Sequence, residues 1–163
     1  MKEFRRPFKK TSTAFDVKVC VIIFVLLIIP TIFIVKFNIF AILFLFIFLL
    51  IIIHLWVAQL FYVILTFEKL VIQNGIYQFW KKEVLYKDIV KVKIIWHGGR
   101  AYPCMKIITK NTSKLSWFYT IDYVDPQDYP EIIEQLETRG GLVETKDIDT
   151  YLTMMENTNR KTK

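Results

Sequence analysis

The sequence predicts an α+β membrane protein: an N-terminal two-helix transmembrane hairpin, then an antiparallel β-sandwich or barrel closed by a C-terminal amphipathic helix. Apolar residues make up 54% of the 163 residues and are concentrated in one block, Val17 to Val63, whereas soluble domains average about 45–50%. After this block the pattern changes to the alternation typical of strands, and an amphipathic segment follows. These observations exclude an ordinary soluble globule and a disordered chain, and two cysteines are too few for a disulfide scaffold.

The apolar block predicts two membrane-spanning helices within residues 19–59. Val19 to Val35 contains no charge and spans roughly 25 Å as a helix, close to the ~30 Å of a hydrocarbon core. Lys36, Phe37 and Asn38 interrupt the run, and a second apolar run begins at Ile39. Because lipid offers backbone groups no hydrogen-bond partner, both runs are expected to be helical.

Basic residues predict the orientation of this hairpin. Six of them precede the first run, and only Lys36 lies in the turn. The positive-inside rule therefore predicts a multi-pass protein of the cell (plasma) membrane, with residues 1–18 as a basic cytoplasmic segment and both termini cytoplasmic. A signal peptide is the alternative, but no small-residue cleavage pattern follows and a second apolar run begins at once. His54 is a functional candidate within the second run, although its place beside Trp56 favours an interfacial role.

The soluble domain is predicted to span residues 60–141. The dipeptide Asn74-Gly75 predicts a tight type I′ hairpin turn, and Val90, Val92, Ile94 and Trp96 alternate as one face of a strand. Strands are expected at residues 60–66, 69–73, 76–80 with an extension towards 86, 90–96, 105–110 and 115–121.

A helix start follows the strands. Asp125 is a suitable N-cap and Pro126 suits the first helical position. Apolar residues then recur at helical spacing up to Leu136, and Gly140-Gly141 predicts the end of the helix. Residues 142–163 are expected to be a tail with a short helix from Ile148 to Met155.

Short antiparallel strands followed by one amphipathic helix are the element order of a pleckstrin-homology (PH) fold. The chain resembles the bacterial PH-like membrane proteins in four features. They are the pair of apolar membrane segments that leads directly into Phe61–Thr66, the dipeptide Asn74-Gly75, the tripeptide Lys87-Asp88-Ile89, and Asp125-Pro126 at the start of the last helix. This family includes cell-envelope proteins without assigned activity and immunity proteins that protect producers of bacteriocins. The resemblance implies self-immunity to a membrane-active antimicrobial peptide. The alternative is a membrane-tethered scaffold or adaptor that recruits a protein partner or anionic lipid to the inner leaflet.

The sequence predicts no enzyme, cofactor or metal site. It contains no HExxH, CxxC or phosphate-binding glycine loop. Cys104 with His97 as a base is the one nucleophile candidate, but a small half-buried side chain is the favoured interpretation of Cys104.

The distribution of charge is more informative about function than the search for catalytic motifs. Residues 69–114 carry ten Lys and Arg against Glu83 and Asp88. The expected partners are anionic lipid headgroups, a bacteriocin peptide or membrane protein partner, and a second copy of the chain. A solvated strand face is the alternative, and nucleic acid is not expected because no recognition helix is evident. The candidate lipid- or peptide-binding residues are Arg5, Arg6, Lys9, Lys10, Lys91, Lys93, Arg100, Trp80 and Trp96.

Overall fold

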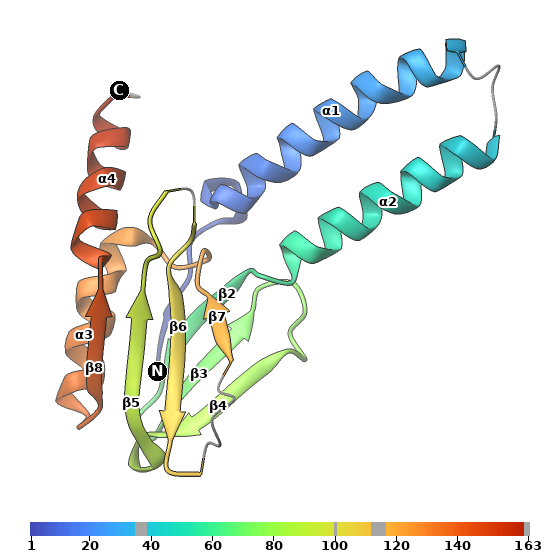
Figure 1. Ribbon diagram of the computed structural model, residues 1–163. Helices are drawn as coiled ribbons and strands as arrows, with labels where there is room; N and C mark the ends of the chain where they lie inside the picture. Colours follow the sequence, from blue (N-terminus) through green and yellow to red (C-terminus); the bar gives the residue numbers. More distant parts are fainter. Residues whose placement is uncertain (35–38, 100, 112–116, 162–163) are drawn as a thin grey trace. The chain divides into compact units, whose positions relative to one another are not determined.

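The computed structural model describes residues 1–34, 39–99, 101–111 and 117–161 (Figure 1). The chain divides into two compact units. Residues 7–58 form the helical unit, and residues 1–6 together with 59–163 form the β unit. The β unit therefore contains both the start and the end of the chain, and the helical unit is inserted between them.

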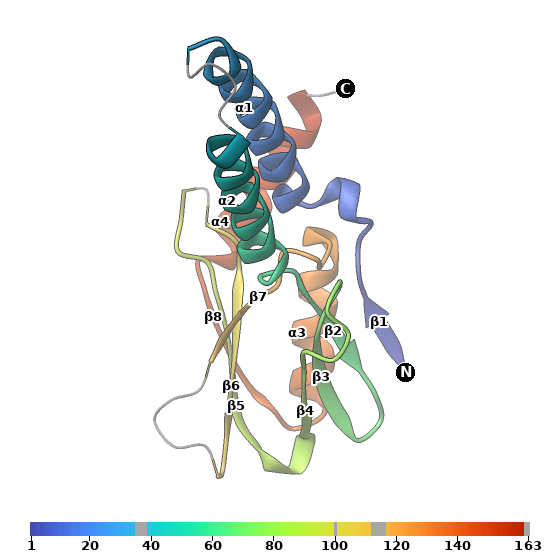
Figure 2. The same ribbon diagram turned by 90° about the vertical axis from the view of Figure 1, so that its right-hand side faces the viewer.

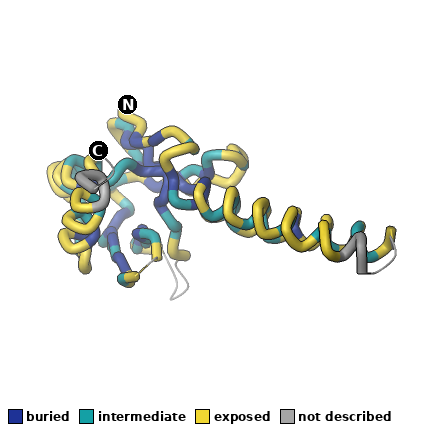
Figure 3. The backbone as a smooth tube through the Cα atoms, turned by 90° about the horizontal axis from the view of Figure 1, so that it is seen from above, coloured by how far each residue is buried: buried dark blue, intermediate teal, exposed yellow. Residues whose placement is uncertain are grey.

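The helical unit contains two long apolar helices, α1 (Ser12–Ile34) and α2 (Ile39–Val57), after the short 3-10 helix η1 (Phe8–Lys10). Both are long and apolar enough to cross a membrane, by length and composition. Few of their residues are buried, unlike those of a core helix in a soluble protein, and Figure 3 shows the exposed colour along much of the helical unit. The first helix begins at Ser12, earlier than the expected residue 19, because helical structure extends into the polar flank.

Within the described residues the β unit has two four-stranded sheets, ordered β1-β2-β3-β4 and β7-β6-β5-β8. The sheets are separate layers (Figure 2), joined by an isolated bridge between Leu60 and Ile121. They form no closed barrel, and β8 pairs in parallel with β5, so the second sheet is mixed. The strands are β1 (Lys2–Phe4), β2 (Phe61–Leu65), β3 (Lys69–Asn74), β4 (Lys81–Leu85), β5 (Ile89–Ile95), β6 (Cys104–Thr109), β7 (Phe118–Thr120) and β8 (Leu142–Lys146).

The expected strand at residues 76–80 is wrong. β3 continues through Asn74, and β4 begins only at Lys81. The side chain of Asn74 accepts hydrogen bonds from the backbone N–H groups of Ile76 and Tyr77, which organises a longer connection in place of the type I′ turn. The hairpin itself is present, since β3 and β4 pair antiparallel from Lys69–Leu85 to Gln73–Lys81.

The alternation expected along β5 holds for Val92, Ile94 and Trp96, which are buried. Val90 is instead 49% exposed. An irregularity in the pairing with β6 between Ile89 and Lys91 shifts the side chains, so that Ile89 takes the buried place.

The C-terminal helix begins as predicted. Asp125 caps the 3-10 helix η3 (Pro126–Asp128), and its side chain accepts a hydrogen bond from the backbone N–H of Gln127. Helix α3 (Tyr129–Thr138) follows, and Gly140 adopts a left-handed φ of +81° after it. In Figure 1 α3 lies beside β8, and its residues Tyr129, Ile132 and Leu136 are buried.

The termini carry more structure than the sequence predicts. Residues 1–18 were expected to be a separate basic segment, but Lys2–Phe4 forms strand β1 beside β2. Residues 142–163 were expected to be a tail, but they contain β8 and the helix α4 (Ile148–Lys161). The short helix predicted at Ile148–Met155 is confirmed and is longer. The end of the expected strand at residues 115–121 is β7, whereas residues 115 and 116 lie outside the described residues.

Candidate functional site

The β unit has one end at which the chain leaves for the helical unit and returns from it. Because β1 and β2 are antiparallel neighbours, the end of β1 and the start of β2 lie at the same end of the sheet. The backbone there is connected by hydrogen bonds from Gly75 N to Leu60 O (2.7 Å), Arg6 N to Tyr123 O (2.8 Å) and Tyr123 N to Phe61 O (3.2 Å). We call this the junction end, and it comprises residues 5–6, 59–61, 74–80 and 121–123.

Arg6 is part of the interior of the junction end. Its side chain is 4% exposed and that of Asp122 is 1% exposed. Arg6 donates from Nε to the Asp122 carbonyl oxygen at 2.8 Å and from Nη2 to Asp122 Oδ1 at 2.5 Å. Tyr129 lies beside this pair, and burial raises its pKa well above the ordinary value. Arg6 was expected to contact lipid or peptide, but in the structure its buried guanidinium is bound to Asp122.

Arg5 lies on the surface of the same end. Its guanidinium carbon lies 5.1 Å from the ring centroid of Tyr62 and 4.9 Å from that of Tyr123. A side-chain hydrogen bond with Tyr123 raises the pKa of Arg5. The side chain remains 40% exposed, so Arg5 combines a cation–π contact with an accessible charge.

Trp80 and Trp96 have different surroundings. Trp80 is 38% exposed and meets Phe61 edge-to-face with centroids 5.5 Å apart, and Phe61 in turn meets Tyr119 at 5.2 Å. Trp96 is 7% exposed, and its Nε1 donates to the carbonyl oxygen of Ala101 at 2.9 Å. Trp80 is therefore the more accessible of the two candidate residues, whereas Trp96 is buried in the core.

The remaining basic candidates separate into two groups. Lys91 and Lys93 are half-buried and form ion pairs with Glu144, the second at 3.1 Å. These contacts lower the pKa of Glu144. Lys9 and Lys10 are exposed in η1, before α1. The sequence did not predict the pairing of Glu144 with Lys91 and Lys93, because strand β8, which carries Glu144 and pairs with β5, was not expected. The last basic candidate, Arg100, lies outside the described residues.

Residues 75–80 form an exposed apolar connection at the junction end. Phe79 is 84% exposed and Ile76 is 49% exposed. The connection is nevertheless well organised, with hydrogen bonds from Trp80 N to Tyr77 O (2.8 Å) and from Asn74 N to Trp80 O (2.9 Å). This connection was not predicted, because Asn74-Gly75 was expected to be a two-residue turn with the returning strand starting at Ile76. The Asn74 side chain instead caps a longer connection.

No feature of the described residues indicates catalysis by Cys104. Its Sγ lies 3.5 Å from the carbonyl oxygen of Tyr102, and burial raises the pKa of its thiol, which lowers the thiolate fraction. Across the described part of the chain, no group of three or more His, Cys, Asp and Glu side chains is placed to hold a metal ion.

No family model matches this chain, and no curated protein or solved structure is significantly similar to it.

Proposed function

We propose that this chain is a membrane-anchored, non-enzymatic binding protein. Helices α1 and α2 cross the plasma membrane as a hairpin and hold the β unit at its cytoplasmic face. The observation that carries the proposal is that two long, apolar and largely exposed helices are inserted between neighbouring strands of a compact β unit. Their exposed apolar surface requires an apolar environment, and a bilayer supplies it.

We assign the β unit to a PH-like module within this proposal. Two sheets followed by the capped helix α3 support this assignment, since a PH fold packs two sheets against one C-terminal helix. Strands β1 and β8 and helix α4 extend that plan at both termini. Such a module binds ligands through its surface and loops, which agrees with a role in recognition.

Within this class we propose self-protection against a membrane-active antimicrobial peptide. The sequence resemblance to PH-like immunity proteins suggests this role, and a module tethered to the membrane acts where such a peptide acts. The test is expression of the full chain in a sensitive strain, followed by killing curves with the cationic peptides encoded near its gene. We expect survival to rise, and unchanged killing by all of these peptides would contradict the protective role.

The control for this experiment is the single variant Arg6→Met, which leaves the Asp122 carboxylate buried without its cation and does not change the sequences of α1 and α2. Protection that requires a folded β unit is expected to decrease with this variant. Fractionation should still recover the variant in the membrane, because the apolar helices are intact.

The second candidate is a scaffold that recruits a protein partner. Strand β4 lies at the edge of its sheet, and Lys81, Lys82 and Glu83 are exposed along it. Edge strands recruit extended peptides by backbone pairing. A photo-crosslinker at Lys82 would capture a partner of defined mass under this candidate, whereas crosslinks to lipid alone would argue against it.

A further inference from the structure

We propose that residues 75–80 are an interfacial lipid-binding loop, whose apolar side chains enter the headgroup boundary of the bilayer that α1 and α2 cross. The inference deepens the proposed function and rests on the membrane insertion of the helices. It names a second, peripheral contact of the β unit with lipid, made by residues that were expected to form a strand.

The exposure of the loop is the first argument. Its sequence is Gly-Ile-Tyr-Gln-Phe-Trp, and Ile76, Phe79 and Trp80 are 49%, 84% and 38% exposed. The loop therefore exposes three large apolar side chains within six residues, with Tyr77 among them. Trp and Tyr are enriched at membrane interfaces, where their rings lie at the level of the headgroups.

The conformation of the loop is fixed before any ligand arrives. Asn74 Oδ1 accepts the N–H groups of Ile76 and Tyr77 at 3.0 and 2.8 Å, and Gln73 Nε2 donates to Gln78 O at 3.2 Å. Trp80 also rests edge-to-face on Phe61. Insertion of the apolar side chains therefore requires little ordering of the loop, which favours binding.

The position of the loop selects lipid as the occupant. Gly75 N donates to Leu60 O at 2.7 Å, and Leu60 is only three residues beyond the end of α2 at Val57. Three residues span at most about 11 Å, so the start of the loop stays close to the point at which the chain enters the membrane.

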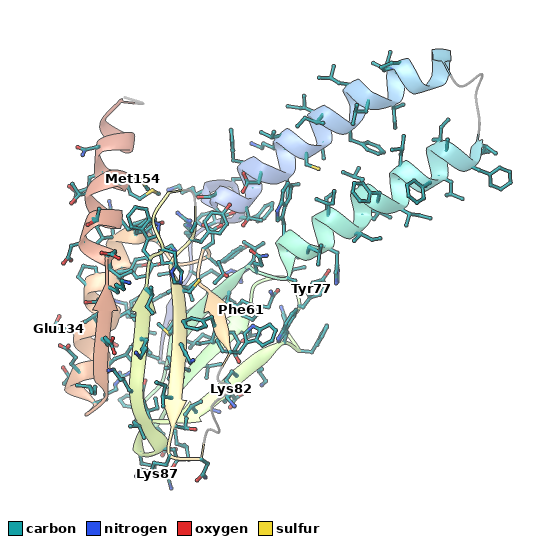
Figure 4. All side chains as sticks on the ribbon, viewed as in Figure 1. Phe61, Tyr77, Lys82, Lys87, Glu134 and Met154 are labelled. Atoms are coloured by element: carbon teal, nitrogen blue, oxygen red, sulfur yellow. The ribbon has the colours of Figure 1, made fainter. Side chains whose placement is uncertain are left out.

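A second exposed phenylalanine shows that exposure alone does not decide the assignment. Phe67 is 90% exposed in the connection between β2 and β3. It lies at the opposite end of the sheet, where Tyr86 N donates to the carbonyl oxygen of its neighbour Glu68 at 3.0 Å. Figure 4 shows Tyr77 and Lys87 towards these opposite ends of the β unit. Phe67 is therefore a matched control with the same side chain.

Charge next to the loop agrees with an anionic bilayer surface. Lys82 is exposed two residues after the loop, and Arg5 donates from Nη2 to Gly75 O at 3.4 Å. Lys81 is also exposed, but it is paired with Glu83 at 2.8 Å. A Lys or Arg near an anionic membrane surface is attracted to the lipid headgroups. The loop thus has the apolar tip and basic flank of an interfacial anchor.

The experiment measures depth with an environment-sensitive fluorophore on single cysteines. The full chain with Cys20→Ala and Cys104→Ala is reconstituted into phosphatidylcholine–phosphatidylglycerol vesicles, and the label is attached at Phe79→Cys, Phe67→Cys or Phe44→Cys. Spin-labelled lipid and aqueous iodide are the two quenchers. Ile76→Cys is a second loop site in case Phe79→Cys disturbs folding.

We expect quenching by spin-labelled lipid at position 79 to exceed that at position 67 severalfold, and iodide to show the reverse order. Lipid quenching at position 44 with iodide access at positions 79 and 76 would overturn the loop assignment alone. Iodide access at position 44 would overturn both the proposed function and the loop assignment. Protection of positions 79 and 76 from both quenchers would indicate a covering protein and would also overturn the assignment.

Discussion

Arg6 and Asp122 form a buried ion pair that fixes the first strand of the chain to the segment before α3. The two residues are 116 positions apart, and Arg6 Nη2 lies 2.5 Å from Asp122 Oδ1. Arg6 also donates to the carbonyl oxygen of Asp122, so one side chain holds both parts of its partner. The residue that follows Arg6 begins the helical unit, and the pair therefore secures one of the two connections between the units.

Removal of one partner of this pair is expected to destabilise the β unit strongly. Arg6→Met leaves the Asp122 carboxylate buried without its cation, and a loss of about 3–5 kcal/mol in the free energy of unfolding is expected. Chemical denaturation in detergent micelles, followed by tryptophan fluorescence, to which the buried Trp96 contributes, measures this loss.

The double variant Arg6→Met/Asp122→Ala is the control for that prediction. Because it leaves no unpaired buried charge, its loss of stability should be smaller than the sum of the two single losses. Strictly additive losses would contradict a direct interaction between the two side chains.

Gly140→Ala is expected to destabilise the β unit by about 1 kcal/mol, since a left-handed backbone disfavours a side chain. A Cβ at Gly140 meets no heavy atom within 4 Å, so the φ of +81° is the whole cause. Gly140→Asn should recover part of the loss, because Asn tolerates this conformation better. Equal losses for Ala and Asn, measured by denaturation, would contradict the backbone explanation.

Acid is expected to remove stability that Glu83 supplies. Hydrogen bonds from Lys69 and then Lys81 lower the pKa of Glu83 from 4.5 to about 2. A depressed folded-state pKa stabilises the fold above the unfolded value, and this contribution is lost as the pH falls from 4.5 towards 2. Glu83→Gln should flatten the decrease in melting temperature over this range. The exposed Glu134→Gln is the control, and an equal effect of both changes would contradict the prediction.

Cys104 is expected to react slowly with alkylating reagents. Burial raises the pKa of its thiol above the ordinary value of 9.0, so little thiolate is present near neutral pH. In a Cys20→Ala background, the rate of alkylation by iodoacetamide should be far below that of free cysteine at pH 8. A rate equal to or above that of free cysteine would instead support an activated nucleophile.

Anionic lipid is expected to gather around Lys9 and Lys10 more than around Lys91 and Lys93. The first two are exposed, whereas Glu144 pairs with the other two. Lys9→Gln/Lys10→Gln should reduce the association of spin-labelled phosphatidylglycerol with the reconstituted chain, at about 1 kcal/mol per charge. Lys91→Gln/Lys93→Gln is the matched control, and a reduction of equal size there would contradict the distinction.

Local signals predicted much of the fold. The long apolar runs predicted both helices, and the Asp125-Pro126 start and the Gly140 stop of the C-terminal helix were confirmed, because each depends on a few neighbouring residues. The edge strands β1 and β8 were not predicted. Each is short and gains its stability from a partner distant in the sequence, which the local pattern does not encode.

The candidate site was harder to predict for the same reason. Arg6 belongs to the same basic run as the exposed Arg5, and only its contact with the distant Asp122 makes it an interior residue. Trp96 follows an alternating strand. Alternation predicts which side chains share one face of the sheet, but it does not predict whether that face is buried, as it is at Trp96. Residues 76–80 were expected to be a strand because they directly follow Asn74-Gly75, which was expected to form a two-residue hairpin turn.

The insertion of the helices between β1 and β2 imposes an order on biosynthesis. The first strand leaves the ribosome before both helices, while its neighbour β2 and the carboxylate of Asp122 are translated after them. The β unit therefore cannot complete its first sheet or bury Arg6 until the helices have been translated. A nascent chain arrested before β2 would hold an unpaired strand and an unneutralised arginine at the entrance to its apolar segment.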